Sequence, residues 1–364
     1  MMPERNLRRQ VAAMPKVDLH RHLEGSIRLQ TLVEIAREYR IPLPSYEVDG
    51  LRPYVQMMAN DPRNLDLFLG KFSVLRQFYR SPEIIRRITA EVVADAAADN
   101  VRYLELRFTP STLASQIHCS IADVIAWVCE AAQQAGREHG VMVRLIVSMN
   151  RHESPELALR ALDAALAARD KGVVGLDLAG RETGFPARPF GPMFFEGKQA
   201  GLGITVHAGE WQGSANVRDA IEHMGADRIG HGVRVVEDSR VVALARERGV
   251  IFEVCPTSNV QSGVVSNIRH HPLIDMYYLG LKTTINTDDP TISDIVLSDE
   301  FMVAARTFHF SFEALQQHVL KAVDAAFLPA DQKAALRAAI CREMGLGGCP
   351  TVQSDDRSSQ VSRV

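Results

Sequence analysis

The sequence predicts an α/β fold in which eight parallel strands alternate with helices and close into a TIM-type (β/α)8 barrel. Short runs rich in β-branched residues alternate with Ala-rich stretches of helical periodicity. There are eight such runs, and most begin about 22 to 31 residues apart, which is the spacing of βα units. An open eight-stranded sheet is the alternative. No G-x-G-x-x-G opens a helix after the first strand, which argues against a dinucleotide-binding sheet.

The predicted strands share an apolar, β-branched character and are followed by polar or glycine-rich residues. The first strand is entered through Pro15, and the fifth ends at a turn-forming Ala208-Gly209 pair. In chain order the strands are Lys16–His20, Val101–Phe108, Val143–Ser148, Val173–Leu178, Gly203–His207, Arg228–Gly230, Val250–Val254 and Lys282–Ile285. Amphipathic helices are predicted between them.

The segment after the first strand is too long for one crossover helix. Residues 26–100 contain no convincing strand, whereas Ile27–Tyr39, Leu51–Ala59 and Pro82–Asp99 have helical periodicity. A helical insertion lying over the strand ends is therefore predicted at about residues 26–100. The apolar patch Leu65–Phe72 could cover a ligand, but packing within the insertion is the favoured interpretation.

The rest of the chain completes a single predicted domain at residues 1–348. Extra helices are expected from Asp299 to about Glu343, after the eighth strand. The polar tail at residues 349–364 is expected to be disordered, since it lacks the apolar residues that a core needs.

Composition excludes several classes of partner. The 41 basic and 44 acidic residues give a net charge of −3 and form no long block of one sign, so nucleic acid is an unlikely partner. The N-terminal stretch has no apolar leader, and no run of 18 apolar residues occurs, so a membrane is not expected either. A cytoplasmic enzyme is the expectation, and the sequence gives no indication of oligomeric state.

The residues suited to chemistry follow the predicted strands. Such strand ends are where barrel enzymes keep their active sites. Imidazoles with a carboxylate form a ligand set suited to Zn²⁺ with one position left open for water. The residues at these positions are His20, His22, His207, His231, Asp288 and Asp289. The remaining histidines fall on predicted helices or loops and are interpreted as ordinary: His118, His139, His152, His223, His270, His271, His309 and His318.

Glu210 is the candidate general acid or base. It stands three residues beyond His207, past Gly209, which lets backbone approach a ligand closely. A salt-bridged loop glutamate is the alternative interpretation. Beside a water activated by a metal, a carboxyl group at this position is suited to proton transfer.

Five sequence blocks resemble the signature motifs of the adenosine/AMP deaminase family, part of the metal-dependent hydrolase superfamily. They occur in the order of that family, from residue 15 to about residue 345, and are most similar to bacterial-type adenosine deaminases. The blocks are Pro15–Ser26, His207–Glu210, Arg228–Gly232, Cys255–Asn259 and Asn286–Pro290. The resemblance implies the same barrel fold that the strand count predicts.

The resemblance also implies roles for individual residues. One zinc ion per chain is expected, and the expected reaction is attack of metal-bound hydroxide on purine C6, which converts adenosine or 2′-deoxyadenosine to inosine or its deoxy form plus ammonia. Glu210 resembles the residue that protonates the neighbouring ring nitrogen, and His231 the residue that orients and deprotonates the water. The implied zinc ligands are His20, His22, His207 and Asp288, and the implied purine-nucleoside contacts are Glu24, Gly180 and Asp289.

Departures from the family pattern leave the substrate open. Glu24 stands where many adenosine deaminases have Asp near the ribose 5′-hydroxyl, so adenine, aminodeoxyfutalosine or another N6- or 5′-substituted adenine nucleoside is the alternative substrate. Trp211 either walls the pocket or packs elsewhere. A binuclear amidohydrolase is disfavoured because strand 4 ends at Gly180 without a bridging lysine. A non-enzymatic descendant is disfavoured because every implied catalytic residue is present.

Overall fold

The computed structural model describes residues 4–347, so the predicted boundary at residue 348 and the tail at 349–364 lie outside the described residues. Eight parallel strands follow one another around a barrel in strict chain order, as predicted. Each strand pairs with the next along the chain because a helical crossover returns the chain to the same end. The strands are β1 (Lys16–His22), β2 (Val101–Phe108), β3 (Met142–Asn150), β4 (Val173–Ala179), β5 (Gly203–Ala208), β6 (Arg228–His231), β7 (Ile251–Val254) and β8 (Lys282–Ile285).

The barrel is closed by the segment that follows β8 rather than by β8 itself. Arg21 and Asp288 form an isolated parallel bridge. The amide of His22 donates to the carbonyl of Asp288 at 2.9 Å, and the amide of Asp288 donates to the carbonyl of His20 at 2.8 Å. Closure at this end therefore places Asp288 directly against His20 and His22, 266 or more residues away in the chain.

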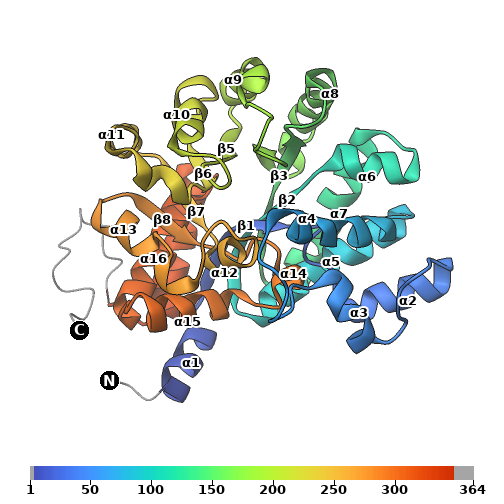
Figure 1. Cartoon of the computed structure of the whole chain (residues 1–364), viewed down its shortest axis with the longest axis horizontal. Coiled ribbons are helices and arrows are strands. Elements are labelled where there is room, and N and C mark those ends of the chain that lie inside the picture. Colours follow the sequence, from blue (N-terminus) through green and yellow to red (C-terminus); the bar gives the residue numbers. More distant parts are fainter. Residues whose placement is uncertain (1–3, 348–364) are drawn as a thin grey trace.

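Helices surround the strands, with α7 to α11 arranged around one side of the barrel in Figure 1. These are α7 (Ile121–His139), α8 (Pro155–Leu166), α9 (Gly191–Gln199), α10 (Ser214–His223) and α11 (Ser239–Glu247). The C-terminal helices are α15 (Leu297–Thr307), α16 (Phe312–Ala325) and α17 (Ala330–Glu343). Between residues 4 and 347 no single helix is long and apolar enough to cross a membrane; only the bent pair of α6 (Pro110–Ile117) and α7 passes that test together, with an angle of 109° between them.

The segment between β1 and β2 is helical, as predicted, but it contains one α-helix and one short 3-10 helix beyond the three that its periodicity indicated. Its helices are α2 (Leu29–Tyr39), α3 (Val48–Val55), α4 (Leu65–Leu75), the short η1 (Arg76–Phe78) and α5 (Pro82–Ala98). The apolar patch forms α4, which begins where the side chain of Asn64 accepts a hydrogen bond from the amide of Leu67. A further helix, α1 (Glu4–Ala13), precedes the first strand.

A layer of buried charge crosses the barrel interior beneath the strand ends. Arg107 and Arg228 are fully buried, and both pair with Glu253. The Arg107 guanidinium lies 2.7 Å from Glu253 Oε2, and Arg228 Nε lies 2.6 Å from Glu253 Oε1. Although burial alone would raise it, these arginines hold the pKa of Glu253 well below its usual range. Removing either partner would leave an uncompensated buried charge, so this layer fixes the strands that carry the site.

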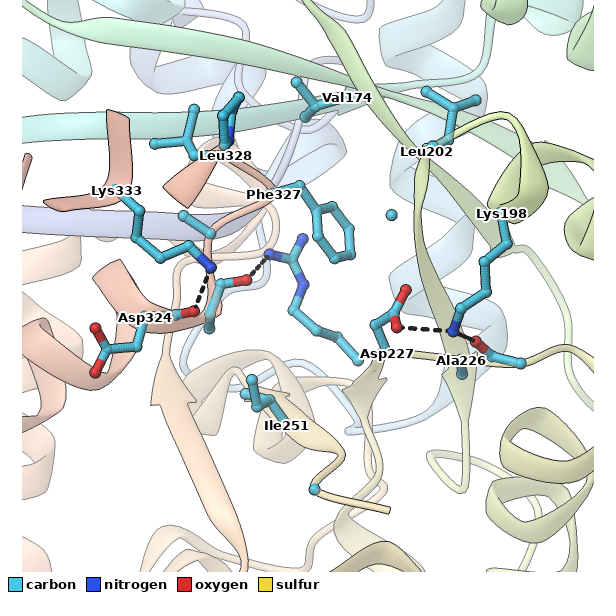
Figure 2. Close-up of a pocket in the computed structure, with 18 of the residues that line it drawn as sticks. Val174, Lys198, Leu202, Ala226, Asp227, Ile251, Asp324, Phe327, Leu328 and Lys333 are labelled. Atoms are coloured by element: carbon cyan, nitrogen blue, oxygen red, sulfur yellow. Dashed lines mark hydrogen bonds and ion pairs between the residues drawn. The ribbon is translucent and has the colours of Figure 1, made fainter. Parts of the chain in front are cut away.

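The side chain of Phe327 covers the barrel interior at the amino-terminal ends of the strands. Its ring lies under the guanidinium of Arg228, 3.6 Å from it, and packs onto Gly203, where an added Cβ would meet the ring at 2.3 Å. Around it is a hollow of about 970 Å³, in which Lys198 pairs with Asp227 at 2.8 Å and Lys333 reaches the Asp324 carbonyl (Figure 2). The histidine and aspartate cluster described below lies at the opposite end.

Candidate active site

Five predicted residues converge at the carboxyl ends of the strands. One ligand atom from each of His20, His207, His231 and Asp288 lies within 4.8 Å of the others, and all four side chains are buried. His22 joins them, because its Nε2 lies 3.3 Å from both His207 Nε2 and Asp288 Oδ1. The geometry therefore brings together the four ligands implied by the resemblance and also His231. Distance alone does not separate His231 from the ligands.

The backbone turns sharply at two of these residues, His231 and Asp288. His231 has φ of 58° and Asp288 has φ of 62°, which is the left-handed region that residues with a Cβ seldom occupy. Each such residue costs about 1 to 3 kcal/mol unless the surroundings impose it. Both positions sit at a strand end, where the turn aims the side chain across the barrel mouth.

Two of the histidines are oriented by buried carboxylates. His20 Nδ1 lies 2.7 Å from Glu253 Oε2, and His207 Nδ1 lies 2.9 Å from Asp177 Oδ1. A carboxylate accepts the Nδ1–H, so the lone pair of each ring is left on Nε2, facing the cluster. His20 Nε2 is buried, faces Asp288 Oδ1 at 3.2 Å and has no hydrogen-bond partner among residues 4–347. Carboxylate-oriented imidazoles with an orphaned nitrogen fit a divalent metal ion.

His231 has different surroundings. Its Nδ1 lies 3.1 Å from Asn259 Nδ2, on the short helix α12 (Pro256–Gln261) that follows β7. Its Nε2 lies 3.8 Å from both Glu210 Oε2 and Asp288 Oδ2. Asp288 Oδ2 in turn accepts a hydrogen bond from Ser258 Oγ at 2.6 Å. The partner of His231 Nδ1 is therefore a side-chain amide, whereas the partners of His20 Nδ1 and His207 Nδ1 are carboxylates.

Glu210 is held in place by another glutamate. The carboxylate of Glu182 accepts hydrogen bonds from the backbone amides of residues 209–212, at 2.7 to 3.2 Å, and from Asn216 Nδ2 at 2.8 Å. This arrangement fixes the loop after β5 and leaves the Glu210 side chain facing His231. Burial, and then the negative charges of Asp288 and Glu182, raise the pKa of Glu210 well above its ordinary value. A protonated carboxyl beside a metal-ligand cluster is able to act as a general acid.

The adjacent aspartates have opposite properties. The cluster histidines, His231 first, outweigh burial and hold the pKa of Asp288 well below its ordinary value. Burial, and then the charge of Asp288, raise the pKa of Asp289 well above its ordinary value. Asp289 Oδ1 is buried without a hydrogen-bond partner in the described part of the chain, and a Cβ on Gly25 would lie 1.8 Å from it. Gly25 is therefore required for this close approach.

Glu24 and Gly180 line the same pocket as Asp289. Glu24 Oε1 accepts a hydrogen bond from the amide of Thr109 at 2.8 Å, whereas its buried Oε2 has no partner within residues 4–347. Burial raises the pKa of Glu24. Gly180 follows β4 with φ of 84°, and an added Cβ would meet His152 Nδ1 at 2.8 Å. Substitution at Gly180 would therefore be strained and crowded.

Helix α4 lines the pocket, so the apolar patch does more than pack within the insertion, which was the favoured of its two interpretations. Phe68, Leu69, Phe72 and Trp211 line the pocket together with three of the histidines and Glu210. Phe68 is also buried in the core, so the patch serves both purposes. Arg76, in η1, lines the pocket as well, and no feature of the sequence had marked it.

Several residues that organise the site were not selected from the sequence. Glu253 and Asp177 are carboxylates inside apolar strands, and that unusual position was the available signal. His271 was interpreted as an ordinary loop residue, yet it is buried and lies 3.2 Å from Asn259 Oδ1. No local pattern marks Glu182 as the acceptor for a loop 27 or more residues away.

An eight-stranded barrel that gathers buried imidazoles and a carboxylate at its carboxyl end has the fold and the side chains of a metal-dependent barrel enzyme. The sequence profile of the adenosine deaminase family matches residues 15–343, so the chain belongs to that family. The adenosine deaminase of Erwinia tasmaniensis is 39% identical over 325 residues, which cover 89% of this chain and 97% of that protein.

Solved structures agree with this assignment. An amidohydrolase from Burkholderia ambifaria with bound zinc has a TM-score of 0.84 and 32% identity, and the match covers 93% of this chain and 92% of that one. The adenine deaminase from Arthrobacter aurescens has a TM-score of 0.83 and 26% identity, covering 91% of this chain and 99% of that one. The predicted family and fold are therefore confirmed.

Proposed function

We propose that this enzyme catalyses the hydrolytic deamination of adenosine and 2′-deoxyadenosine to the corresponding inosine and ammonia. The observation that carries the proposal is Glu210, a buried carboxyl with a raised pKa whose Oε2 lies 3.8 Å from His231 Nε2 at the edge of the ligand cluster. The naming of the Erwinia tasmaniensis relative as an adenosine deaminase supports the same substrate. We also propose that the enzyme acts in purine metabolism in the cytoplasm.

We propose one zinc ion per chain, held by His20, His22, His207 and Asp288. The orientation of His20 and His207 by carboxylates supports this ligand set, as does the zinc bound by the Burkholderia ambifaria neighbour. When bound, such an ion lowers the pKa of a water molecule toward neutrality. The donor set alone would also accept other first-row divalent ions, so metal analysis is part of the test.

The protein's own groups would then direct the reaction at purine C6. Glu210, kept protonated by its surroundings, would deliver its proton to the ring nitrogen next to C6 as the hydroxyl of water adds to C6, so that negative charge does not build up on the ring. The other proton of that water would leave with the amino group as ammonia, and the hydroxyl proton lost when C6 becomes a carbonyl would return to Glu210. His231 would hydrogen-bond the attacking water. Asp289, also protonated, would donate a hydrogen bond to the five-membered ring, and the Gly180 amide would contact the six-membered ring.

Adenine or a modified adenine nucleoside remains the alternative substrate. The side chain of Glu24 is tied to the Thr109 amide through one oxygen, and its other oxygen is free to contact a ribose. The same side chain would fill part of the space that a missing ribose leaves. The Arthrobacter aurescens neighbour, which has a similar fold, is an adenine deaminase, so the fold is compatible with this alternative substrate.

The decisive experiment compares kcat/KM for adenosine, 2′-deoxyadenosine, adenine and 5′-modified adenosines on metal-quantified enzyme, with ammonia release as the readout. We expect adenosine to exceed adenine by at least about tenfold, or roughly 1.4 kcal/mol of transition-state binding. Glu210→Gln serves as the control, because it should keep zinc yet lose on the order of 10² in kcat. A preference for adenine would overturn the nucleoside assignment, and near-normal turnover of Glu210→Gln would overturn its role.

A further inference from the structure

A backbone amide outside the active site begins a chain of hydrogen bonds that ends at His231. Leu273 is the first residue of α13 (Leu273–Tyr278), so its N–H has no acceptor within the helix. This N–H donates to His271 Nδ1 at 3.1 Å. Because a backbone N–H can only donate, His271 Nδ1 must carry the lone pair. Burial lowers the pKa of His271 to about 3, so the ring is neutral and its single proton sits on Nε2.

The proton on His271 fixes the orientation of Asn259. His271 Nε2 lies 3.2 Å from Asn259 Oδ1, and a protonated nitrogen requires an acceptor at that distance. The carbonyl oxygen of the amide therefore faces His271, and its NH2 group faces His231. Both residues are buried, with Asn259 fully inaccessible and His271 1% exposed, so these bonds are shielded from bulk solvent.

The orientation of Asn259 in turn fixes the proton on His231. Asn259 Nδ2 donates to His231 Nδ1 at 3.1 Å, so that nitrogen carries the lone pair. A neutral His231 ring then holds its proton on Nε2, the atom that lies 3.8 Å from both Glu210 Oε2 and Asp288 Oδ2. This is the opposite arrangement to His20 and His207, whose Nδ1–H groups point at carboxylates.

We propose that His271 and Asn259 are positioning residues that hold His231 as its Nε2–H tautomer. His231 then presents a donor to the reaction centre, whereas His20 and His207 present lone pairs. In this tautomer His231 would orient the attacking water but would not take its proton, which departs from the role that the family resemblance implies. A nitrogen that carries a proton cannot bind a metal ion. This relay of hydrogen bonds, from Leu273 through His271 and Asn259 to His231, therefore explains why His231 would face the substrate and not join the metal ligands, although it lies close to them. The kinetic part of this inference rests on the proposed deaminase function, but the tautomer does not.

The tautomer is measured directly by ¹⁵N NMR on the full-length enzyme labelled at histidine, without substrate. A His231→Gln sample identifies the His231 signals by their loss. We expect a protonated Nε2 and an unprotonated Nδ1 in the wild type. A protonated Nδ1 on neutral His231 would overturn the proposal whatever the enzyme's substrate is.

Two variants test the relay itself. Asn259→Asp replaces the donor with an acceptor of the same shape, so His231 should switch to the Nδ1–H tautomer. With the substrate identified as above, kcat should fall at least about tenfold while KM changes less than about threefold. His271→Phe removes the donor that orients Asn259, and His271→Gln restores one, so Gln should recover part of the kcat that Phe loses.

A purely structural role for these residues gives a different pattern. His318→Phe, at another buried histidine, is the matched control for loss of stability, and it should leave both the tautomer and kcat unchanged. If Asn259→Asp keeps the wild-type tautomer and kcat, the relay does not set His231. If His271→Gln and His271→Phe lose kcat equally, His271 does not act through its donor.

Discussion

Replacing Glu182 with Gln should weaken the active site without touching any atom of the histidine and aspartate cluster. Glu182 accepts five N–H groups, four from the backbone of residues 209–212 and one from Asn216, and the loop they fix carries Glu210. Glutamine keeps the shape of the side chain but offers only one acceptor oxygen. The other position becomes an NH2 group that faces donors.

The cost can be worked out bond by bond. The amide oxygen should turn toward the three amides of residues 210–212, and Asn216 can turn its own amide to accept from the new NH2. The Gly209 N–H then lacks an acceptor, which costs about 1 to 3 kcal/mol, and three charge-assisted bonds become neutral at about 1 kcal/mol each. The total is roughly 4 to 6 kcal/mol, or about 5 to 8 °C in Tm for a chain of this length.

Activity should fall as well, because a displacement of about 1 Å at a catalytic group can reduce the rate on the order of 10²-fold. We expect kcat to drop by about 10- to 100-fold, measured as ammonia release at a temperature well below the Tm of the variant. Glu182 also contributes a negative charge that raises the pKa of Glu210. Without it, Glu210 should lose its proton at lower pH, so the alkaline decline of kcat should shift to lower pH.

The control is Glu247→Gln, the same substitution at an exposed position of α11, which should change neither property. Calorimetry and kinetics on the same samples separate two outcomes. A large fall in Tm with a small fall in kcat would mean that the loop stabilises the barrel but does not position Glu210. If Tm stays within about 2 °C and kcat within about twofold of wild type, the reasoning from five hydrogen bonds is wrong.

Three further predictions address the metal, the pH dependence and the closed end of the barrel. Asp288→Ala should lower zinc content by elemental analysis, and full occupancy with full activity would remove Asp288 from the ligand set. Burial raises the pKa of Glu300 from 4.5 to about 8, so the folded state keeps a proton that the unfolded state has released and stability falls as pH rises through this window. Glu300→Gln should therefore gain roughly 4 kcal/mol over wild type in urea unfolding at pH 8 but less than about 1 kcal/mol at pH 5, and equal gains would contradict this. Gly203→Ala should cost about 1 to 3 kcal/mol against Phe327 and leave kcat unchanged; a Phe327→Ala background should relieve that cost.

The strand ends of this protein were predictable because two independent patterns coincide there. Apolar, β-branched runs mark the strands, and polar residues suited to metal binding follow them directly, as His207 follows Ile204–Val206. His20 and His22 are two residues apart, so a strand places both on the same face. A parallel barrel brings all such ends to one mouth, so the sequence predicts that these histidines meet there.

Other features depend on contacts that the sequence does not encode locally. The patch Leu65–Phe72 has the composition of a core segment, and only the position of α4 over the strand ends makes it a wall of the pocket. Asp288 comes within 3.3 Å of His22 because the segment after β8 closes the barrel against β1. Closure is a property of all eight strands together, so no window of sequence shows it.

The placement of protons is a still longer-range property. His20, His207 and His231 are the same side chain at similar positions, and apart from the family resemblance the sequence offers no reason to treat them differently. His20 meets a carboxylate 233 residues away, on β7, whereas His231 meets an amide whose orientation is set by a further histidine and a helix amide. The first arrangement exposes a lone pair to the cluster and the second exposes a proton. The sequence identifies the side chains of this site. The hydrogen-bond partner of Nδ1 on each ring then decides which histidines can bind a metal ion and which can donate a hydrogen bond.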